Sequence, residues 1–317
     1  MKSNQNPQHL TKKNVPDEWF TWRKKDSYEQ ELVSRPSLSY WKDAWRRLVK
    51  NKLAMLGLVF LILLIMMAIF GPMVSPYEVN TGELSNQYKP PSADHWFGTD
   101  NLGRDVFTRT WYGARISLFV GFMAALIDVT VGIIWGGISG YKGGRTDNIM
   151  MRIIEILYGL PYLLVVILLL VVLGPSLSTI IVALTVTGWV GMARIVRGQV
   201  MQIKNYEYVL ASKSFGTKTP RIIRRNLLPN TMGPIIVQMT LTVPSAIFAE
   251  AFLSFIGLGI QAPFASWGVM ASDSLGAILS GYWWTLFFPA FFISFTMFAF
   301  NVLGDGLQDA LDPKLRK

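Results

Sequence analysis

The feature that most constrains this chain is a series of apolar blocks, each long enough to cross the hydrocarbon core of a bilayer. At about 1.5 Å per residue, a helix needs about 20 apolar residues for one crossing. Hydrophobic residues make up 51% of the 317 residues and charged residues only 16%, which is too apolar for a soluble domain. The sequence therefore predicts an all-α integral membrane protein with six transmembrane helices. The expected spans are Leu53–Met73, Ile116–Ile138, Ile153–Leu173, Leu177–Met192, Pro234–Phe255 and Trp283–Leu303.

A seventh apolar stretch, Gly257–Leu279, is rich in glycine and interrupted by Pro263. Proline removes a helical hydrogen bond and clashes with the preceding turn, so this stretch is a poor candidate for a straight span. We expect a re-entrant or surface segment here.

The distribution of basic residues predicts the orientation of the spans. If both termini lie on one side, only Lys89, Arg104, Arg109 and Arg115 of the 30 Lys and Arg residues fall on the other side. Basic residues collect on the cytoplasmic side of membrane proteins. Both termini are therefore expected in the cytoplasm. This asymmetry also accounts for the net charge of +10 without a nucleic-acid partner.

The polar segments around the blocks predict the remaining organisation. Trp41, Trp45 and Leu48 recur at helical spacing among basic residues, which favours an amphipathic interfacial helix over a merely basic linker. The expected order is a disordered cytoplasmic tail (1–35), the interfacial helix (36–52), a transmembrane domain (53–304) with an outward loop (75–115) and a second loop (204–230), and a cytoplasmic C-terminal tail (305–317).

The outward loop contains the run Phe97–Asp105, FGTDNLGRD, which combines acidic residues with Gly and Asn. Its oxygens do not have the spacing of a calcium loop. Gly, Asp and Asn favour tight turns in which Asp side chains accept hydrogen bonds from nearby backbone. We therefore expect a structural turn and not a metal site.

The loop at 204–230 is a basic segment between two apolar spans. We expect a short helix from Glu207 to Phe215 that ends at Gly216, where glycine readily adopts a positive φ. Thr219 followed by Pro220 is a good start for a second helix, because the hydroxyl can cap and the proline suits the first turn. A rigid helix–glycine–helix unit on the cytoplasmic side predicts a surface on which another protein docks.

Motifs for catalysis and nucleotide binding are missing from the sequence. It contains no cysteine, and its two histidines, His9 and His95, lie outside the predicted spans. No Gly-Lys dipeptide occurs, so the usual phosphate-binding loop for ATP is absent. We expect no catalytic residue, no cofactor site and no metal site in this chain.

Two carboxylates, Asp128 and Glu250, fall on separate predicted spans. A charge at the bilayer centre costs about 2.5–3.5 kcal/mol on insertion scales, so each needs a partner or a role. Asp128 either pairs with an arginine or backbone donor of a neighbouring helix or subunit, or lines a polar path. Glu250 lies towards the outer end of its span and is expected to face a subunit interface or the cavity.

The loop at 204–230 resembles the cytoplasmic loop of bacterial binding-protein-dependent ABC importers. Their pattern is Glu-Ala-Ala, three residues, Gly, and then Leu-Pro further on. Here Leu210-Ala211-Ser212 is followed by Gly216 and by Leu228-Pro229. The chain departs from the pattern at Leu210, where glutamate is usual, and at Asn226, where isoleucine is frequent.

Other stretches are similar to the C-type permeases of oligopeptide, dipeptide and nickel importers. The similarity covers nearly everything after about residue 40, and it is greatest to the oligopeptide-permease C subunit. The stretches that carry it are Asp94–Leu118, Glu250–Met270 and Asp305–Lys317.

The resemblance implies a type I ABC importer permease fold and a multi-pass protein of the bacterial cytoplasmic membrane. It implies a non-catalytic subunit that forms half of a translocation pathway for peptides, with oligopeptides as the favoured substrates. The implied partners are a homologous second permease, two ATPase subunits that bind ATP and magnesium, an extracytoplasmic peptide-binding protein and membrane lipids. The alternatives are an ion-coupled secondary transporter that uses Asp128 or Glu250, or a nickel-chelate or dipeptide importer of the same family.

The resemblance also assigns the loop at 204–230, hereafter the coupling loop, to contact with an ATPase subunit. Its first helix would sit in a groove of that subunit and its second helix would carry motion into the spans. Arg221, Arg224 and Arg225 share one helical face, with either phospholipid or the ATPase as partner. The residues implied in coupling are Glu207, Tyr208, Val209, Leu210, Ala211, Ser212, Lys213, Phe215, Gly216, Lys218, Leu228 and Pro229.

Overall fold

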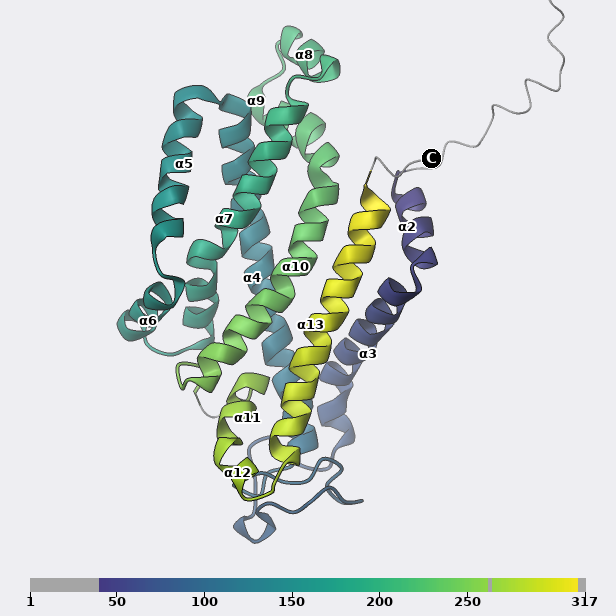
Figure 1. Cartoon of the computed structure of the whole chain (residues 1–317), viewed down its shortest axis with the longest axis vertical. Coiled ribbons are helices and arrows are strands. Elements are labelled where there is room, and N and C mark those ends of the chain that lie inside the picture. The colour runs from purple at the N-terminus through teal and green to yellow at the C-terminus, as the bar shows by residue number, and fades with distance from the viewer. Residues whose placement is uncertain (1–39, 262–263, 313–317) are drawn as a thin grey trace, which may run out of the picture. The chain divides into compact units, whose positions relative to one another are not determined.

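The computed structural model describes residues 40–261 and 264–312 (Figure 1). The predicted tail at 1–35 and the first residues of the predicted interfacial helix lie outside these ranges. The chain divides into two units, Met1–Asp43 and Ala44–Lys317, and the packing described below is that of the second unit. Within the described residues, all regular structure is helical except for an isolated β-bridge between Thr99 and Asp105.

The helices follow one another in a simple order along the chain. They are α2 (Tyr40–Lys50), α3 (Lys52–Val74), the 3₁₀ turn η2 (Leu84–Asn86), α4 (Val106–Lys142), α5 (Gly144–Gly159), α6 (Tyr162–Leu173), α7 (Leu177–Ile203), α8 (Glu207–Ser214), α9 (Thr219–Ile222), the π-helical turn η3 (Ile223–Leu227), α10 (Leu228–Phe255), α11 (Trp267–Asp273), α12 (Leu275–Leu279) and α13 (Trp284–Leu311).

The predicted fold class is confirmed. Five helices among the described residues are long and apolar enough to cross a membrane, namely α3, α4, α7, the α9–α10 unit and α13. The bent pair formed by α5 and α6 brings the total to six if it counts as one span. In Figure 1, α8 lies at one end of the second unit, with the C-terminal end of α13, whereas α11 and α12 lie at the opposite end.

The third predicted span, Ile153–Leu173, is broken in the structure. α5 ends at Gly159 and α6 begins at Tyr162, and the two axes differ by 83°. Leu160, between them, has an extended backbone (φ −79°, ψ 131°). The α conformation is disfavoured for a residue before proline, and Pro161 follows directly. The continuous apolar character of the block led to the prediction of a single span, although Pro161 is the local signal for this break.

Three other boundaries differ from those predicted. The outward loop ends at Asp105, because α4 begins at Val106 and not after residue 115. The stretch Gly257–Leu279 contains α11 and α12, and α11 is packed against α4, α10 and α13 with Trp267 fully buried. Helix α13 continues to Leu311 through much of the predicted C-terminal tail. It does so because its last turns are amphipathic, with Asp305 and Asp309 exposed and Ala310 buried.

The most extensive helix contact, between α4 and α7, depends on small residues along α4. Gly132, Gly136 and Gly140 recur every four residues and face α7. A Cβ at Gly140 would lie 2.8 Å from the carbonyl oxygen of Arg197, so any larger residue would force the two backbones apart. In lipid, such close approach replaces the hydrophobic effect as the source of helix association.

We expect Gly140→Val to weaken the packing of α4 on α7 and to lower the free energy of unfolding by about 1–3 kcal/mol, as overpacking usually does. Gly198→Val on α7 is the matched control, since no atom lies within 4 Å of a Cβ at that position. Denaturant unfolding of the purified chain in detergent measures both. Equal stability of the two variants would contradict the proposed role of the α4 glycines in the contact with α7.

Candidate functional site

The coupling loop begins with α8, a short helix held on the bundle by one buried side chain. Val209 is 2% exposed and packs in a cluster with Ile203, Ile222 and Leu227. Ser212, one turn later, receives a hydrogen bond of 3.0 Å from the Asn226 side chain. Asn226, one of the two departures from the family pattern, therefore fastens α8 to the segment that follows it.

The end of α8 has the geometry predicted from the sequence. Gly216 has φ +71°, its N–H donates to the carbonyl of Lys213, and the N–H of Thr217 donates to the carbonyl of Ser212 at 3.2 Å. These bonds satisfy carbonyls that the helix end would otherwise leave without partners. The chain is thereby turned sharply from α8 into the next helix.

The exposed residues of α8 differ in part from those predicted to contact a partner. Val209 points to the bundle, so the expectation that it supplies partner contact area is wrong, whereas Ser212 is half-buried and its predicted contact stays a prediction. Tyr208, Leu210 and Phe215 are exposed, and Phe215 retains 88% of its accessible surface. The remaining predicted coupling residues that lie at the surface are Glu207, Ala211, Lys213, Gly216, Lys218 and Pro229, with Leu228 half-buried. An exposed aromatic ring on a charged, basic loop is typical of a binding surface.

The second helix of the coupling loop is continuous with a membrane-spanning helix. α9, the π-helical turn Ile223–Leu227 and α10 together form one candidate span, Thr219–Phe255. Thr219 is the first helical residue, and Lys218 occupies the cap position without a side-chain capping bond, so the predicted Thr219 cap is wrong. Pro220 does lie in the first turn, as expected. A displacement of α8 would therefore reach the spans through the turn between Phe215 and Lys218 and the helical unit Thr219–Phe255.

Near the same end, one ion pair ties three helices together. The Arg197 guanidinium on α7 donates two bonds of 2.6 Å to the carboxylate of Asp147 on α5, and Ser139 on α4 donates a third at 2.5 Å. Such bidentate arginine–carboxylate pairs are among the strongest hydrogen-bonded contacts. Sequence analysis did not single out this pair, although opposite charges at the ends of two spans were its available signal.

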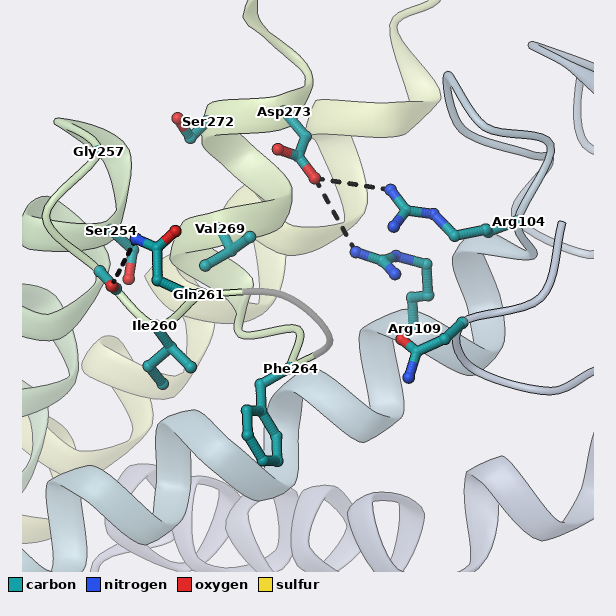
Figure 2. Close-up of a pocket in the computed structure, with 12 residues that line it drawn as sticks. Arg104, Arg109, Ser254, Gly257, Ile260, Gln261, Phe264, Val269, Ser272 and Asp273 are labelled. Atoms are coloured by element: carbon teal, nitrogen blue, oxygen red, sulfur yellow. Dashed lines mark hydrogen bonds and ion pairs between the residues drawn. The ribbon is translucent and has the colours of Figure 1, made fainter. Parts of the chain in front are cut away.

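At the opposite end of the bundle lies a cavity of about 460 Å³. Figure 2 shows Arg104 and Arg109 pointing across it towards Asp273 at the end of α11. Ser254 and Gln261 also line the cavity. Burial raises the pKa of the Asp273 carboxyl above its ordinary value, and Arg109 and Arg104 offset this only in part. None of these residues was predicted as a site, because they come from a loop, a helix start and a short helix far apart in the sequence.

The run FGTDNLGRD forms a structural turn, as predicted. Asp100 accepts hydrogen bonds from the N–H groups of Leu102 and Arg104 at 2.9 and 3.0 Å, and from the Arg104 side chain at 2.7 Å. Asp105 caps α4 by accepting from the N–H of Thr108 at 2.8 Å and also contacts His95 at 3.0 Å. Backbone and side-chain donors thus occupy these carboxylates.

Glu250 lies inside the subunit with no exposed surface. Its carboxylate accepts hydrogen bonds from the hydroxyl groups of Ser117, Ser254 and Ser266 at 3.2, 2.8 and 2.7 Å. Ser266 also caps α11. The expectation that Glu250 faces a subunit interface or the cavity is wrong, because its carboxylate joins α4, α10 and α11 from within. The packing of α4 and α11 around Glu250, and not its position along the span, determines that its carboxylate is buried.

Asp128 is also buried, with 5% of its surface exposed, but its environment is different. Its Oδ1 atom has no hydrogen-bond partner among the described residues. The carboxylate occupies the space where a Cβ of Gly188 would lie, at 2.5 Å from Oδ2, so only glycine fits opposite it on α7. The predicted pairing with a donor of a neighbouring helix is therefore not found within the described chain.

Comparison with known proteins identifies the family. Residues 129–317 match the family described as binding-protein-dependent transport system inner membrane component. The chain belongs to this family. Residues 39–91 of the permease match a second description, the N-terminal TM domain of oligopeptide transport permease C. The resemblance stated from the sequence is confirmed.

Relatives with high identity cover almost the whole permease. It is 77% identical over 303 residues to the dipeptide transport system permease protein DppC of Bacillus subtilis, covering 96% of this chain and 95% of the relative. It is 61% identical to the oligopeptide transport system permease protein OppC of the same organism (96% and 99%) and 44% identical to OppC of Haemophilus influenzae (91% and 92%).

We expect Glu250→Ala to destabilise the permease, because three serine hydroxyls would lose their acceptor in a buried site. Leaving a buried donor unsatisfied costs about 1–3 kcal/mol. Glu250→Gln, which keeps one carbonyl acceptor, should lose less. Thermal unfolding of the purified permease, together with the rate of proteolysis between α10 and α11, measures the effect. Wild-type behaviour of Glu250→Ala in both assays would argue against a structural role.

Proposed function

We propose that this permease forms half of the translocation pathway of an ATP-driven, binding-protein-dependent importer of peptides. In this proposal a homologous permease supplies the other half. Two ATPase subunits bind ATP and magnesium, and an extracytoplasmic binding protein delivers the peptide. The observation that supports the proposal is the coupling loop, in which a largely exposed helix is joined by a short turn to a membrane span.

The mechanical part of the proposal follows from that geometry. An ATPase subunit would grip the exposed face of α8, with Tyr208, Ala211 and Phe215 as apolar contacts and Lys213 and Lys218 as charged ones. Closure of the ATPase pair would move α8 as a rigid body, and the continuous helix from Thr219 to Phe255 would carry that movement into the bundle. The permease itself would catalyse no reaction.

The orientation of the permease is part of the same proposal. We place α8 and both termini in the cytoplasm of a bacterial cell, with the membrane as the cytoplasmic membrane. The clustering of basic residues supports this. So does the position of the C-terminal end of α13 at the same end of the second unit as α8 (Figure 1).

Peptides are the proposed substrates because all three relatives described above are named for dipeptides or oligopeptides. These names favour peptides over nickel chelates. The dipeptide relative is the more similar of the two from Bacillus subtilis, so the proposal covers both dipeptides and longer peptides. Asp128 is proposed as a polar group of the pathway or of the contact with the second permease, where a donor would complete Oδ1.

Reconstitution into liposomes tests the function. Uptake of labelled trialanine should require ATP, the second permease, both ATPase subunits and the binding protein. The ion-coupled alternative predicts instead that the permease alone takes up trialanine along a proton or sodium gradient and that Asp128→Asn abolishes this. Uptake by the permease alone would overturn the proposal.

We expect Ala211→Glu to reduce co-purification of the ATPase subunits about tenfold, equivalent to about 1.4 kcal/mol. The reason is that a charge on the outward face of α8 would be desolvated against the partner. Ala93→Glu is the matched control, since Ala93 is also exposed but lies in the loop at the opposite end. Equal recovery of ATPase with both variants would mean that this face of α8 points away from the partner.

A further inference from the structure

The cavity at the end opposite α8 contains a buried arginine whose partners hold it loosely. Arg109 is 3% exposed, yet its Nε lies 3.4 Å from Asp100 and its terminal nitrogen 3.9 Å from Asp273. Within the described residues, its side-chain hydrogen bond to the carbonyl of Val79 is 3.3 Å long. Arginine–carboxylate hydrogen bonds are usually about 2.7–2.9 Å. Among the described residues, the buried guanidinium therefore has no acceptor closer than 3.3 Å.

Another arginine–carboxylate pair in the same protein has much shorter hydrogen bonds. Arg197 and Asp147 are joined by two bonds of 2.6 Å. In the cavity, Asp100 is committed to Arg104 at 2.7 Å, and Asp273 lies 3.6 Å from Arg104. The side chain of Asp273 is also 42% exposed, and it faces a terminal nitrogen of each arginine (Figure 2). A gap of 3.6 and 3.9 Å therefore separates Asp273 from the two guanidinium groups that line the cavity.

We propose that this gap is a substrate subsite that binds the carboxylate terminus of a peptide between Arg104 and Arg109, with Asp273 as the internal group that the peptide displaces. The inference rests on the proposed function and specifies the chemistry that the permease recognises. Planar guanidinium groups match a carboxylate in shape as well as in charge.

Two observations favour a free peptide over an acidic side chain of a docked protein. The cavity volume of about 460 Å³ lies within the range of small-molecule sites, about 300–1,000 Å³. The arginines also share the cavity with groups that can bind a peptide backbone, including Asn80, Gln261 and Ser272. A single acidic side chain of a docked protein would need only the positive charge of the arginines and not these additional polar groups.

Direct binding to the assembled transporter tests the inference. The permease with its second permease and ATPase subunits, in lipid nanodiscs and without binding protein, is titrated with trialanine and with trialanine amide. The wild type should bind the free acid more tightly than the amide. Arg104→Gln should weaken binding of the acid about tenfold and Asp273→Asn should strengthen it about threefold, both leaving the amide unchanged. Lys89→Gln, a loop cation outside the cavity, is the control and should change neither.

The opposite signs of the two variants separate recognition from damage to the fold, which would weaken binding in both. An acid-to-amide ratio that is the same in the wild type, Arg104→Gln and Asp273→Asn would overturn the subsite. So would an Arg104→Gln variant that only lowers the stimulation of ATP hydrolysis by the binding protein, because the cavity would then receive an acidic protein side chain. If the wild type imports trialanine but shows no preference for the acid, only the subsite fails; if it imports no peptide, the proposed function fails as well.

Discussion

The close approach of α4 and α7 is the contact on which the other features of this permease depend. Glycines along α4 let the two backbones meet, and the same contact positions two polar sites. At one end, the contact brings Arg197 to Asp147. In the middle, it seats the carboxylate of Asp128 against Gly188. Helices in lipid gain little from hydrophobic burial against each other, so this steric fit determines where the charges lie.

Helix α10 connects the two ends of the bundle. Its N-terminal extension begins in the coupling loop, and its last turns carry Glu250 and Ser254. Glu250 ties α10 to α4 and α11, and Ser254 both bonds to Glu250 and lines the cavity with the two loosely paired arginines. A partner acting on α8 would therefore act, through one helix, on the wall of the proposed carboxylate subsite. In that case a continuous helix, and not a series of weak side-chain contacts, would connect the ATPase-binding loop to the substrate subsite.

Local signals in the sequence were reliable where the physics is local. Gly216 has the positive φ expected of a residue that ends a helix, and the Asp-rich turn uses its carboxylates on its own backbone. Predictions that needed packing information failed. The inward direction of Val209 and the burial of Glu250 depend on residues far along the chain. Apolar residues lie on every side of the span that contains Glu250, so its periodicity does not say which face is buried.

The amino-acid sequence by itself determined that this chain is a helical membrane protein with a rigid basic loop between its fourth and fifth apolar blocks. Hydrocarbon solvates no backbone polar group, so apolar blocks of sufficient length must be helical. Only the tertiary structure decided what its few intramembrane charges do. Glu250 became a structural acceptor because three serines converge on it, whereas Asp128 and Arg109 were left with polar atoms that the described chain satisfies poorly or not at all. The reason is distance: a buried charge is satisfied only by donors and acceptors within about 3 Å, and these come from other helices.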